Sequence, residues 1–178
     1  MKMCLGALEK AFKLLGKGEV KVPNKIVLEL PPSEKERGRL NGLAAYIGGD
    51  WEVAGIKWIP GFPKNPQKYN LPRANALIIL NNTENGLPLA VMDGTIISAM
   101  RTGAMGGLGA KYLARKDSEI VALIGLGVQA RTQAMALKEV LPNLKEFRGY
   151  RRNKAQAVKV AAEIQEMTSI KTVAADSP

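Results

Sequence analysis

The pattern of apolar and polar positions changes near residue 119 of the 178-residue chain. From there on, short apolar runs alternate with segments whose apolar residues recur every three or four positions. This alternation predicts strands over 119–124, 146–150 and 170–174 and helices over 128–140 and 154–167. Strands that alternate with helices of this length form right-handed βαβ units, so we predict a parallel sheet for this part of the chain.

The pattern before residue 119 predicts a helix followed by strands. The helix is expected over 5–15, where leucine and phenylalanine recur at spacings of three and four. Apolar runs bounded by turn residues predict strands over 25–30, 53–59, 76–80 and 87–92. The last two flank a turn at 81–86 and are expected to form a hairpin. Charged or proline-rich stretches are interpreted as loops at 33–42 and 60–73.

A further helix is expected over 97–115, although it carries four glycines at 103, 106, 107 and 109. Glycine inside a helix costs about 1 kcal/mol relative to alanine, so four of them need a structural reason. We expect close packing against another backbone or against a ligand, because a glycine leaves room for either.

Composition excludes several kinds of site. Histidine is absent and Cys4 is the only cysteine, so the chain has no internal disulfide, no Ser-His-Asp triad and none of the usual zinc ligand sets. We therefore expect no metal. No apolar run approaches the roughly 18 residues of a membrane span, and the N-terminus lacks the features of a signal peptide. A cytoplasmic protein without a membrane partner is expected.

The net charge of +10 suits an anionic partner, such as a phosphate or a carboxylate. The basic residues are scattered and form no run typical of a nucleic-acid-binding tail. We expect no nucleic acid as a partner, and a basic scaffold that binds nucleic acid stays only as an alternative.

One motif carries specific chemistry, the sequence Gly-Leu-Gly-Val-Gln-Ala at 125–130. It follows a predicted strand and opens a predicted helix, which is the setting of the dinucleotide-binding turn of Rossmann domains. Gly125 makes the tight turn, and Gly127 lets the backbone approach a pyrophosphate. Val128 and Gln129 begin the helix whose N-terminal amides face the phosphates. The alternative is a structural glycine turn between a buried strand and a helix.

The end of the second strand of this unit indicates the type of dinucleotide. NAD-binding domains have an acidic residue there, which binds the adenosine ribose, but this chain has Arg151 and Arg152. Arginine pairs well with a 2′-phosphate, so the sequence favours NADP over NAD. In the alternative interpretation, both arginines are solvated surface charges.

Several short segments occur in an order and spacing typical of one known family: Ala-Gly-Ile-Lys-Trp (54–58), Pro-Lys-Asn (63–65), Gly-Leu-Pro-Leu-Ala (86–90), Ile-Ser-Ala-Met-Arg-Thr-Gly-Ala (97–104), Tyr-Leu-Ala-Arg (112–115) and the glycine motif at 125–130. With them, the chain resembles the ornithine cyclodeaminase/mu-crystallin family over nearly its whole length. Some segments are most similar to its amino-carboxyethyl-glutamate dehydrogenases (55–59, 62–65 and 71–74) and others to mu-crystallin (90–94 and 150–153). The subfamily therefore stays open.

The resemblance implies an N-terminal α+β domain that binds substrate and dimerises, followed by a Rossmann domain with a doubly wound parallel sheet. We expect the first domain over 1–97, a connecting helix over 98–117 and the Rossmann part over 118–178. A doubly wound domain has about six strands, whereas this part of the chain predicts half of them. The chain is therefore expected to be truncated, with the family's catalytic aspartate beyond it.

The resemblance also implies function. Family members are homodimers that transfer hydride between NAD or NADP and a small amino or imino acid, as ornithine cyclodeaminases, amino-acid dehydrogenases or ketimine reductases. Lys57 and Arg101 match positions that hold the substrate carboxylate, and Lys57 is also expected to be catalytic. Lys25 takes a position that is usually arginine, Arg73 suits a second carboxylate, and Thr102 is expected near the nicotinamide. The alternatives are a non-enzymatic NADP(H)-binding protein of mu-crystallin type and an inactive fragment.

Two of these residues also have plainer interpretations. Lys57 could be a lysine on an edge strand whose ammonium group reaches solvent. Arg101 lies near a helix start, where a cation is unfavourable, so an anionic partner is expected. That partner is either a substrate or a carboxylate of the chain itself.

Overall fold

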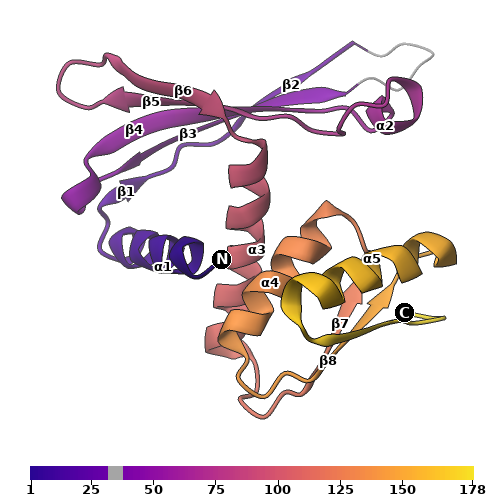
Figure 1. Ribbon diagram of the computed structural model, residues 1–178. Helices are drawn as coiled ribbons and strands as arrows, with labels where there is room; N and C mark the ends of the chain where they lie inside the picture. Colours follow the sequence, from indigo (N-terminus) through magenta and orange to yellow (C-terminus); the bar gives the residue numbers. More distant parts are fainter. Residues whose placement is uncertain (32–37) are drawn as a thin grey trace. The chain divides into compact units, whose positions relative to one another are not determined.

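The computed structural model describes residues 1–31 and 38–178 (Figure 1). The chain divides into two compact units, one made of Met1–Glu9 with Ala99–Pro178 and the other of Lys10–Ser98. We call them the parallel unit and the antiparallel unit, after the sheet that each contains. The domain limits expected from the sequence stay a prediction.

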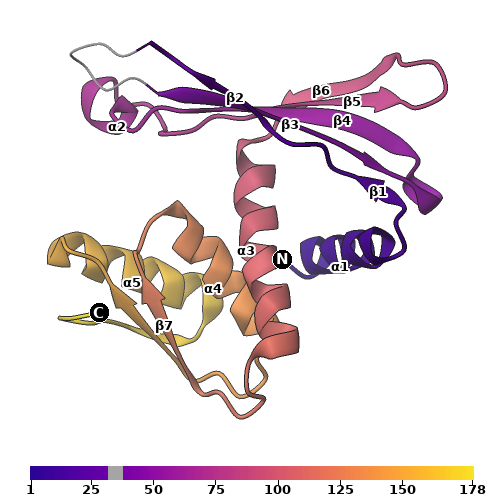
Figure 2. The same ribbon diagram turned by 180° about the vertical axis from the view of Figure 1, so that it is seen from behind.

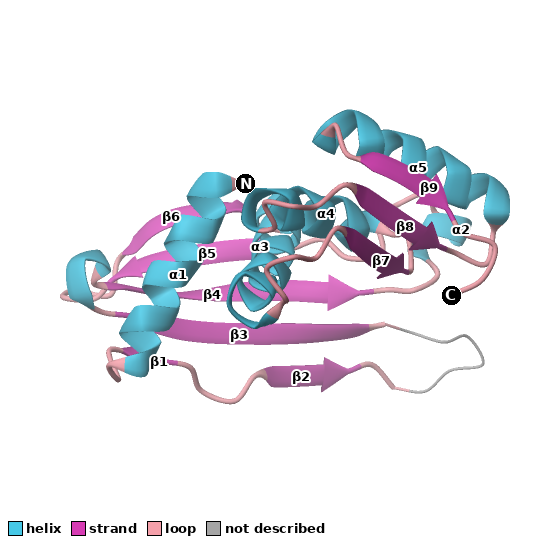
Figure 3. Ribbon diagram, turned by 90° about the horizontal axis from the view of Figure 1, so that it is seen from below, coloured by secondary structure: helices cyan, strands magenta, loops and turns pink. Residues whose placement is uncertain are grey.

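The antiparallel unit is built on one sheet (Figure 3). Its strands follow the order β1-β3-β4-β5-β6, and β2 pairs with β3 as well. Every pairing is antiparallel. The strands are β1 (Val20–Lys21), β2 (Ile26–Glu29), β3 (Arg39–Ile47), β4 (Val53–Gly61), β5 (Leu77–Asn82) and β6 (Pro88–Asp93), with two short helices, η1 (Gly49–Trp51) and α2 (Asn65–Lys68).

Two loop predictions need correction. Residues 39–42 belong to β3, which the sequence analysis missed, whereas 33–37 lie outside the described residues. The strand lacks a regular alternation of apolar and polar residues, and its backbone hydrogen bonds come from strands on both of its sides. The loop expected over 60–73 is wrong at 60–61, which end β4, and at 65–68, which form α2.

The hairpin predicted around 81–86 is confirmed by the antiparallel pairing of β5 with β6. The turn depends on Asn82, whose side-chain oxygen accepts hydrogen bonds from the amides of Glu84 and Asn85 at 2.7 and 3.2 Å. Gly86 closes it with a φ of +75°, a conformation that favours glycine.

The parallel unit contains a sheet of order β7-β8-β9 with both pairings parallel, as predicted. Its helices α4 and α5 lie on one side of the strands in Figures 1 and 2, as consecutive right-handed crossovers require. The elements are α4 (Val128–Val140), α5 (Lys154–Thr168), β7 (Ile120–Ile124), β8 (Glu146–Tyr150) and β9 (Lys171–Ala174). One antiparallel and one parallel sheet, each with helices, confirm the mixed α/β fold class.

The core of the parallel unit lies between its sheet and these two helices. Phe147 of β8 and Ile164 of α5 are completely buried, and Leu126, in the loop after β7, is 1% exposed. Fully burying such side chains contributes about 1.5–3 kcal/mol each, so this layer holds β7, β8 and α5 together.

Two further helices are divided between the units, α1 (Lys2–Gly16) and α3 (Thr95–Leu113). Within the parallel unit, α3 packs closely against α4. A Cβ atom on Gly103 would lie 2.5 Å from the carbonyl of Thr132, and one on Gly107 would lie 2.8 Å from the Cβ of Ala136. Close backbone packing therefore explains two of the four helix glycines, as predicted, whereas a Cβ on Gly109 would meet no heavy atom within 4 Å.

The other face of the parallel sheet carries charge on β8 and β9. Glu146 accepts hydrogen bonds from Arg148 at 2.7 Å and from Lys171 at 2.6 Å. These hydrogen bonds, and the attraction of the two cations, lower the pKa of the Glu146 carboxyl.

Candidate functional site

The glycine turn (residues 125–127) follows β7 directly. Gly125 has a φ of +96°, a conformation that favours glycine, and its amide donates to the carbonyl of Tyr150 at 2.9 Å. The tight turn predicted for Gly125 is therefore present, and its first amide is bonded to the last residue of β8.

Leu126 fastens the middle of the glycine turn to β8 in two ways. Its side chain is buried against Gly149, where an added Cβ would lie 2.8 Å from both of its methyl carbons. Its carbonyl accepts a hydrogen bond from Nη1 of Arg151 at 3.0 Å. The glycine turn is thus held by the last two residues of β8 and the residue that follows the strand, namely Gly149, Tyr150 and Arg151.

The glycine turn is open at its last residue, Gly127. Gly127 precedes the first residue of α4, has an extended backbone and provides no side-chain cap for the helix. A Cβ on Gly127 would meet no heavy atom within 4 Å, and Val128 is 69% exposed, with Gln129 also exposed. The first amides of a helix have no partner within it and attract anions. These residues fit the pyrophosphate of a dinucleotide.

Arg131 is a residue of this region that the sequence analysis missed. It lies one helical turn after Gly127 and donates from Nη1 to the Gly127 carbonyl at 3.1 Å. Its Nε donates to Glu163 of α5 at 2.8 Å, and its Nη2 bonds to the same carboxylate oxygen. Arg131 thereby connects the glycine turn to α5. The only signal in the sequence is its spacing of four residues from Gly127.

The basic residues after β8 differ in their surroundings. Arg151 is half-buried and bonded to the glycine turn, whereas Arg152 is exposed. Asn153 caps α5 by accepting a hydrogen bond from the amide of Gln156 at 3.0 Å. Lys154 forms an ion pair with Asp176 at 2.5 Å, which raises the pKa of the lysine and lowers that of the aspartate.

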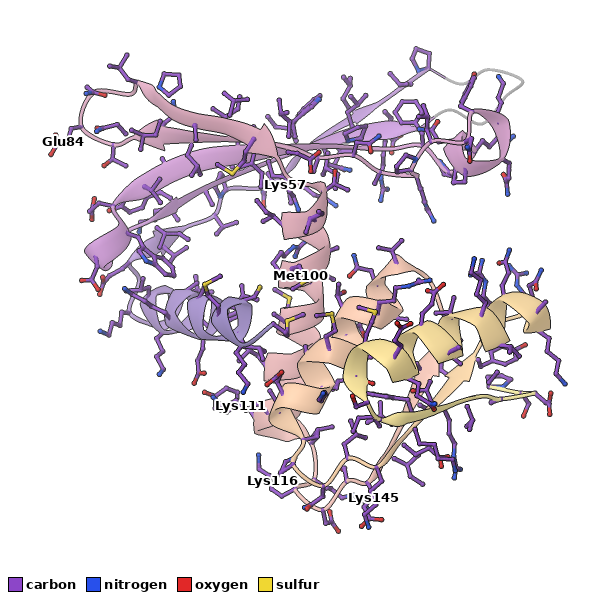
Figure 4. The ribbon with its side chains drawn as sticks, in the orientation of Figure 1. Lys57, Glu84, Met100, Lys111, Lys116 and Lys145 are labelled. Carbon is purple, nitrogen blue, oxygen red and sulfur yellow. The ribbon has the colours of Figure 1, made fainter. Side chains whose placement is uncertain are left out.

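Lys57 lies in the antiparallel unit, on β4. This strand pairs with β3 on one side and with β5 on the other, so the interpretation as an edge lysine is wrong. The half-buried ammonium group donates to Oγ of Ser98 at 3.2 Å, and Figure 4 shows Lys57 beside the first turn of α3. The lysine is therefore held at the N-terminal end of a helix.

The other residues expected to bind substrate lie in both units. Lys25 is exposed and directly precedes β2. If the pairing of β2 with β3 continued by one residue, the Cα atom of Lys25 would lie two strand spacings, about 10 Å, from that of Lys57. Arg73 is also exposed, and its carbonyl accepts a hydrogen bond from the amide of Phe62 at 2.8 Å. Arg101 and Thr102 are half-buried on the part of α3 that belongs to the parallel unit. Their convergence with Lys57 stays a prediction.

Across 1–31 and 38–178, no group of three or more histidine, cysteine, aspartate or glutamate residues is placed to hold a metal ion. No helix in these ranges has the length and apolar character needed to cross a membrane.

Comparison with known proteins gives consistent matches. The sequence model of the ornithine cyclodeaminase/mu-crystallin family matches residues 1–178. An alanine dehydrogenase of Archaeoglobus fulgidus is 43% identical over 150 residues, which cover 84% of this chain and 44% of that protein. The N-((2S)-2-amino-2-carboxyethyl)-L-glutamate dehydrogenase of Staphylococcus aureus is 40% identical over 101 residues, covering 57% of this chain and 30% of that protein.

Solved structures are similar over almost the whole chain. The Δ1-pyrroline-2-carboxylate reductase of Thermococcus litoralis, in complex with NADH and L-proline, has a TM-score of 0.91 and 40% identity. The match covers 99% of this chain and 53% of that one. An archaeal alanine dehydrogenase dimer with bound NAD has a TM-score of 0.86 and 40% identity, covering 97% and 50% of the two chains. The chain thus spans about half the length of these relatives.

Proposed function

The chain belongs to the ornithine cyclodeaminase/mu-crystallin family, and we propose that the whole protein is an NAD(P)-dependent oxidoreductase acting on a small amino or imino acid. The open glycine turn, fastened to the end of β8 and followed by the uncapped N-terminus of α4, is the observation that carries this proposal. Two relatives that are 40% identical to this chain over the matched half of their own length contain bound NADH or NAD, which supports a nicotinamide cofactor.

In this proposal, the chain supplies the pyrophosphate site of the cofactor. The amides of Val128 and Gln129 donate to the phosphates, and Gly127 leaves the space that they need. A bound nicotinamide supplies or accepts a hydride. NADP is the preferred form, since Arg151 and Arg152 stand where an acidic residue would bind the adenosine ribose of NAD.

Substrate binding is assigned to basic side chains. Lys57 is held at Ser98 on a central strand, where its charge is half-buried and favours an anionic partner such as a substrate carboxylate. Arg101 and Thr102, both on α3 in the parallel unit, are assigned from the family resemblance, Arg101 to the substrate carboxylate and Thr102 to the nicotinamide. Lys25 and Arg73 are exposed and extend the site toward a substrate with a second carboxylate.

A homodimer forms part of the proposal, supported by one face of the antiparallel sheet. The register places Ile26, Leu77 and Val91 on the same face, and they are 62%, 46% and 62% exposed. Exposed apolar patches of this kind mark interaction surfaces. A dimer mass in sedimentation equilibrium supports this part, and a monomer at micromolar concentration contradicts it.

The experiment that tests the function has two stages. Titration of this chain with NADPH and NADH, followed by nucleotide fluorescence, measures cofactor binding. The whole protein is then assayed with alanine and proline for reduction of NADP⁺ or NAD⁺ at 340 nm. Ornithine and lysine are assayed for release of ammonia, because their conversion to cyclic amino acids consumes no net cofactor. Binding with turnover supports the enzyme, and binding without turnover favours the non-enzymatic NADP(H)-binding protein. Absence of binding contradicts both.

A further inference from the structure

Arg131 carries its charge at an unfavourable place in α4. The residue lies in the first turn of the helix, where a cation opposes the helix dipole. Its Nη1 nevertheless donates to the Gly127 carbonyl at 3.1 Å. The carbonyl of the residue that precedes a helix already accepts the first backbone hydrogen bond of that helix. The bond from the Arg131 side chain is therefore a second one, which the helix itself does not need.

The Gly127 carbonyl belongs to the same peptide as the amide of Val128, the first residue of α4. A peptide is planar, with its carbonyl and its N–H pointing in opposite directions, so a bond that fixes one of them also fixes the other. Gly127 has no side chain that could restrain this peptide, and it provides no side-chain cap for the helix. Arg131 supplies the restraint from the helix side.

Glu163 of α5 determines how Arg131 is oriented. One carboxylate oxygen of Glu163 accepts hydrogen bonds from Nε of Arg131, at 2.8 Å, and from its Nη2. Because the guanidinium group is a planar fork, this pairing directs the remaining nitrogen, Nη1, to the Gly127 carbonyl. Glu163 has a fixed position, since the next residue of α5, Ile164, is completely buried. Its carboxylate also offsets the cation near the start of α4.

We propose that Arg131 and Glu163 form a positioning pair for dinucleotide binding, an inference that rests on the dinucleotide site of the proposed function. The pair holds the peptide between Gly127 and Val128 with its amide directed at the pyrophosphate, and neither side chain binds the dinucleotide itself. The pyrophosphate is common to NADPH and NADH, so the pair acts equally on both. Attraction of the phosphates by the charge of Arg131 alone would give the carboxylate of Glu163 the opposite effect.

The test measures the dissociation constants of three variants for NADPH and NADH by nucleotide fluorescence. Arg131→Met keeps a long side chain without its donors, and we expect both affinities to fall by about fivefold or more, with their ratio unchanged. Glu163→Ala should weaken both by a similar factor, because Arg131 loses its orientation. If Arg131 acted through its charge, removal of the neighbouring carboxylate would instead strengthen binding. The double variant should bind no more weakly than Arg131→Met, since the two residues act as one unit.

Arg148→Met is the matched control. Arg148 also bonds to a carboxylate of the parallel unit, that of Glu146 at 2.7 Å, but on the face of the sheet away from α4 and α5. Its loss should change neither dinucleotide affinity. Thermal unfolding shows whether each variant is folded at the temperature of the titration. If Arg131→Met does not fold, the sign of the change in Glu163→Ala decides.

Contrary outcomes separate the positioning pair from the proposed function. Unchanged or increased affinity of folded Glu163→Ala overturns the positioning pair, and so does unchanged affinity of folded Arg131→Met. Losses that add in the double variant, or a loss confined to NADPH, also contradict it. These outcomes leave the proposed function intact, whereas absence of binding of either dinucleotide to the unmodified chain contradicts the proposed function itself.

Discussion

Replacing Gly127 by valine tests the phosphate-binding assignment with little disturbance of the fold. The backbone of this residue is extended, with φ −99° and ψ −161°, which valine adopts readily. Its Cβ would have no heavy atom within 4 Å in the folded chain. The main structural cost is a poorer residue at the helix cap, about 1 kcal/mol. Thermal unfolding of Gly127→Val should therefore stay cooperative, with a modest decrease in Tm.

Dinucleotide binding should respond much more strongly. The new side chain fills the space through which the backbone approaches the pyrophosphate, so the α4 amides lose their contact with it. A hydrogen bond to a charged group contributes about 1.5–3 kcal/mol, and the loss of two at the lower end amounts to about 3 kcal/mol. This corresponds to a decrease in affinity on the order of 100-fold. Fluorescence titration with NADPH and NADH measures it.

The matched control is Gly109→Val, the same substitution at another open position. A Cβ on Gly109 also meets no heavy atom within 4 Å, and the residue lies inside α3. Its dinucleotide affinity should be unchanged, and its stability equal or slightly higher, because valine is the better helix former. Unchanged affinity of Gly127→Val would remove the phosphate-binding assignment. Unfolding of Gly127→Val would show instead that the space beside Gly127 is not open.

Two further predictions concern stability. Gly103→Ala should lower the free energy of unfolding by about 2 kcal/mol or more, since its Cβ would lie 2.5 Å from the backbone of Thr132. Gly106→Ala is the control, because its Cβ would lie 3.7 Å from the nearest heavy atom. In urea unfolding, this control should be neutral or stabilising. Glu146 has a pKa below its ordinary value of 4.5, so its ion pairs stabilise the fold above that pH, and this contribution is lost as the pH falls through the lowered pKa. In urea unfolding measured from pH 7 to pH 3, the free energy of unfolding of Glu146→Gln should accordingly decrease less than that of the unmodified chain. Equal pH profiles of the two proteins would contradict this.

The sequence alone determined the elements whose periodicity is strong. The helix expected over 128–140 and the strand over 146–150 have the observed limits, because each presents one apolar face to the same core. The glycine motif was recognisable for a similar reason, since Gly125 needs a φ that other residues rarely adopt. Local backbone chemistry and periodicity are properties of neighbouring residues and can be read without the fold.

Only the tertiary structure decided the contacts between residues that are far apart in the sequence. β3 is a strand because β2 and β4 satisfy its backbone, and no local pattern records those partners. Arg131 and Glu163 are 32 residues apart, and Arg151 and Leu126 are 25 apart, so only the folded chain brings their charges and carbonyls together. The same holds for the adjacent residues Arg151 and Arg152: only the folded chain shows that Arg151 donates to the glycine turn whereas Arg152 is exposed.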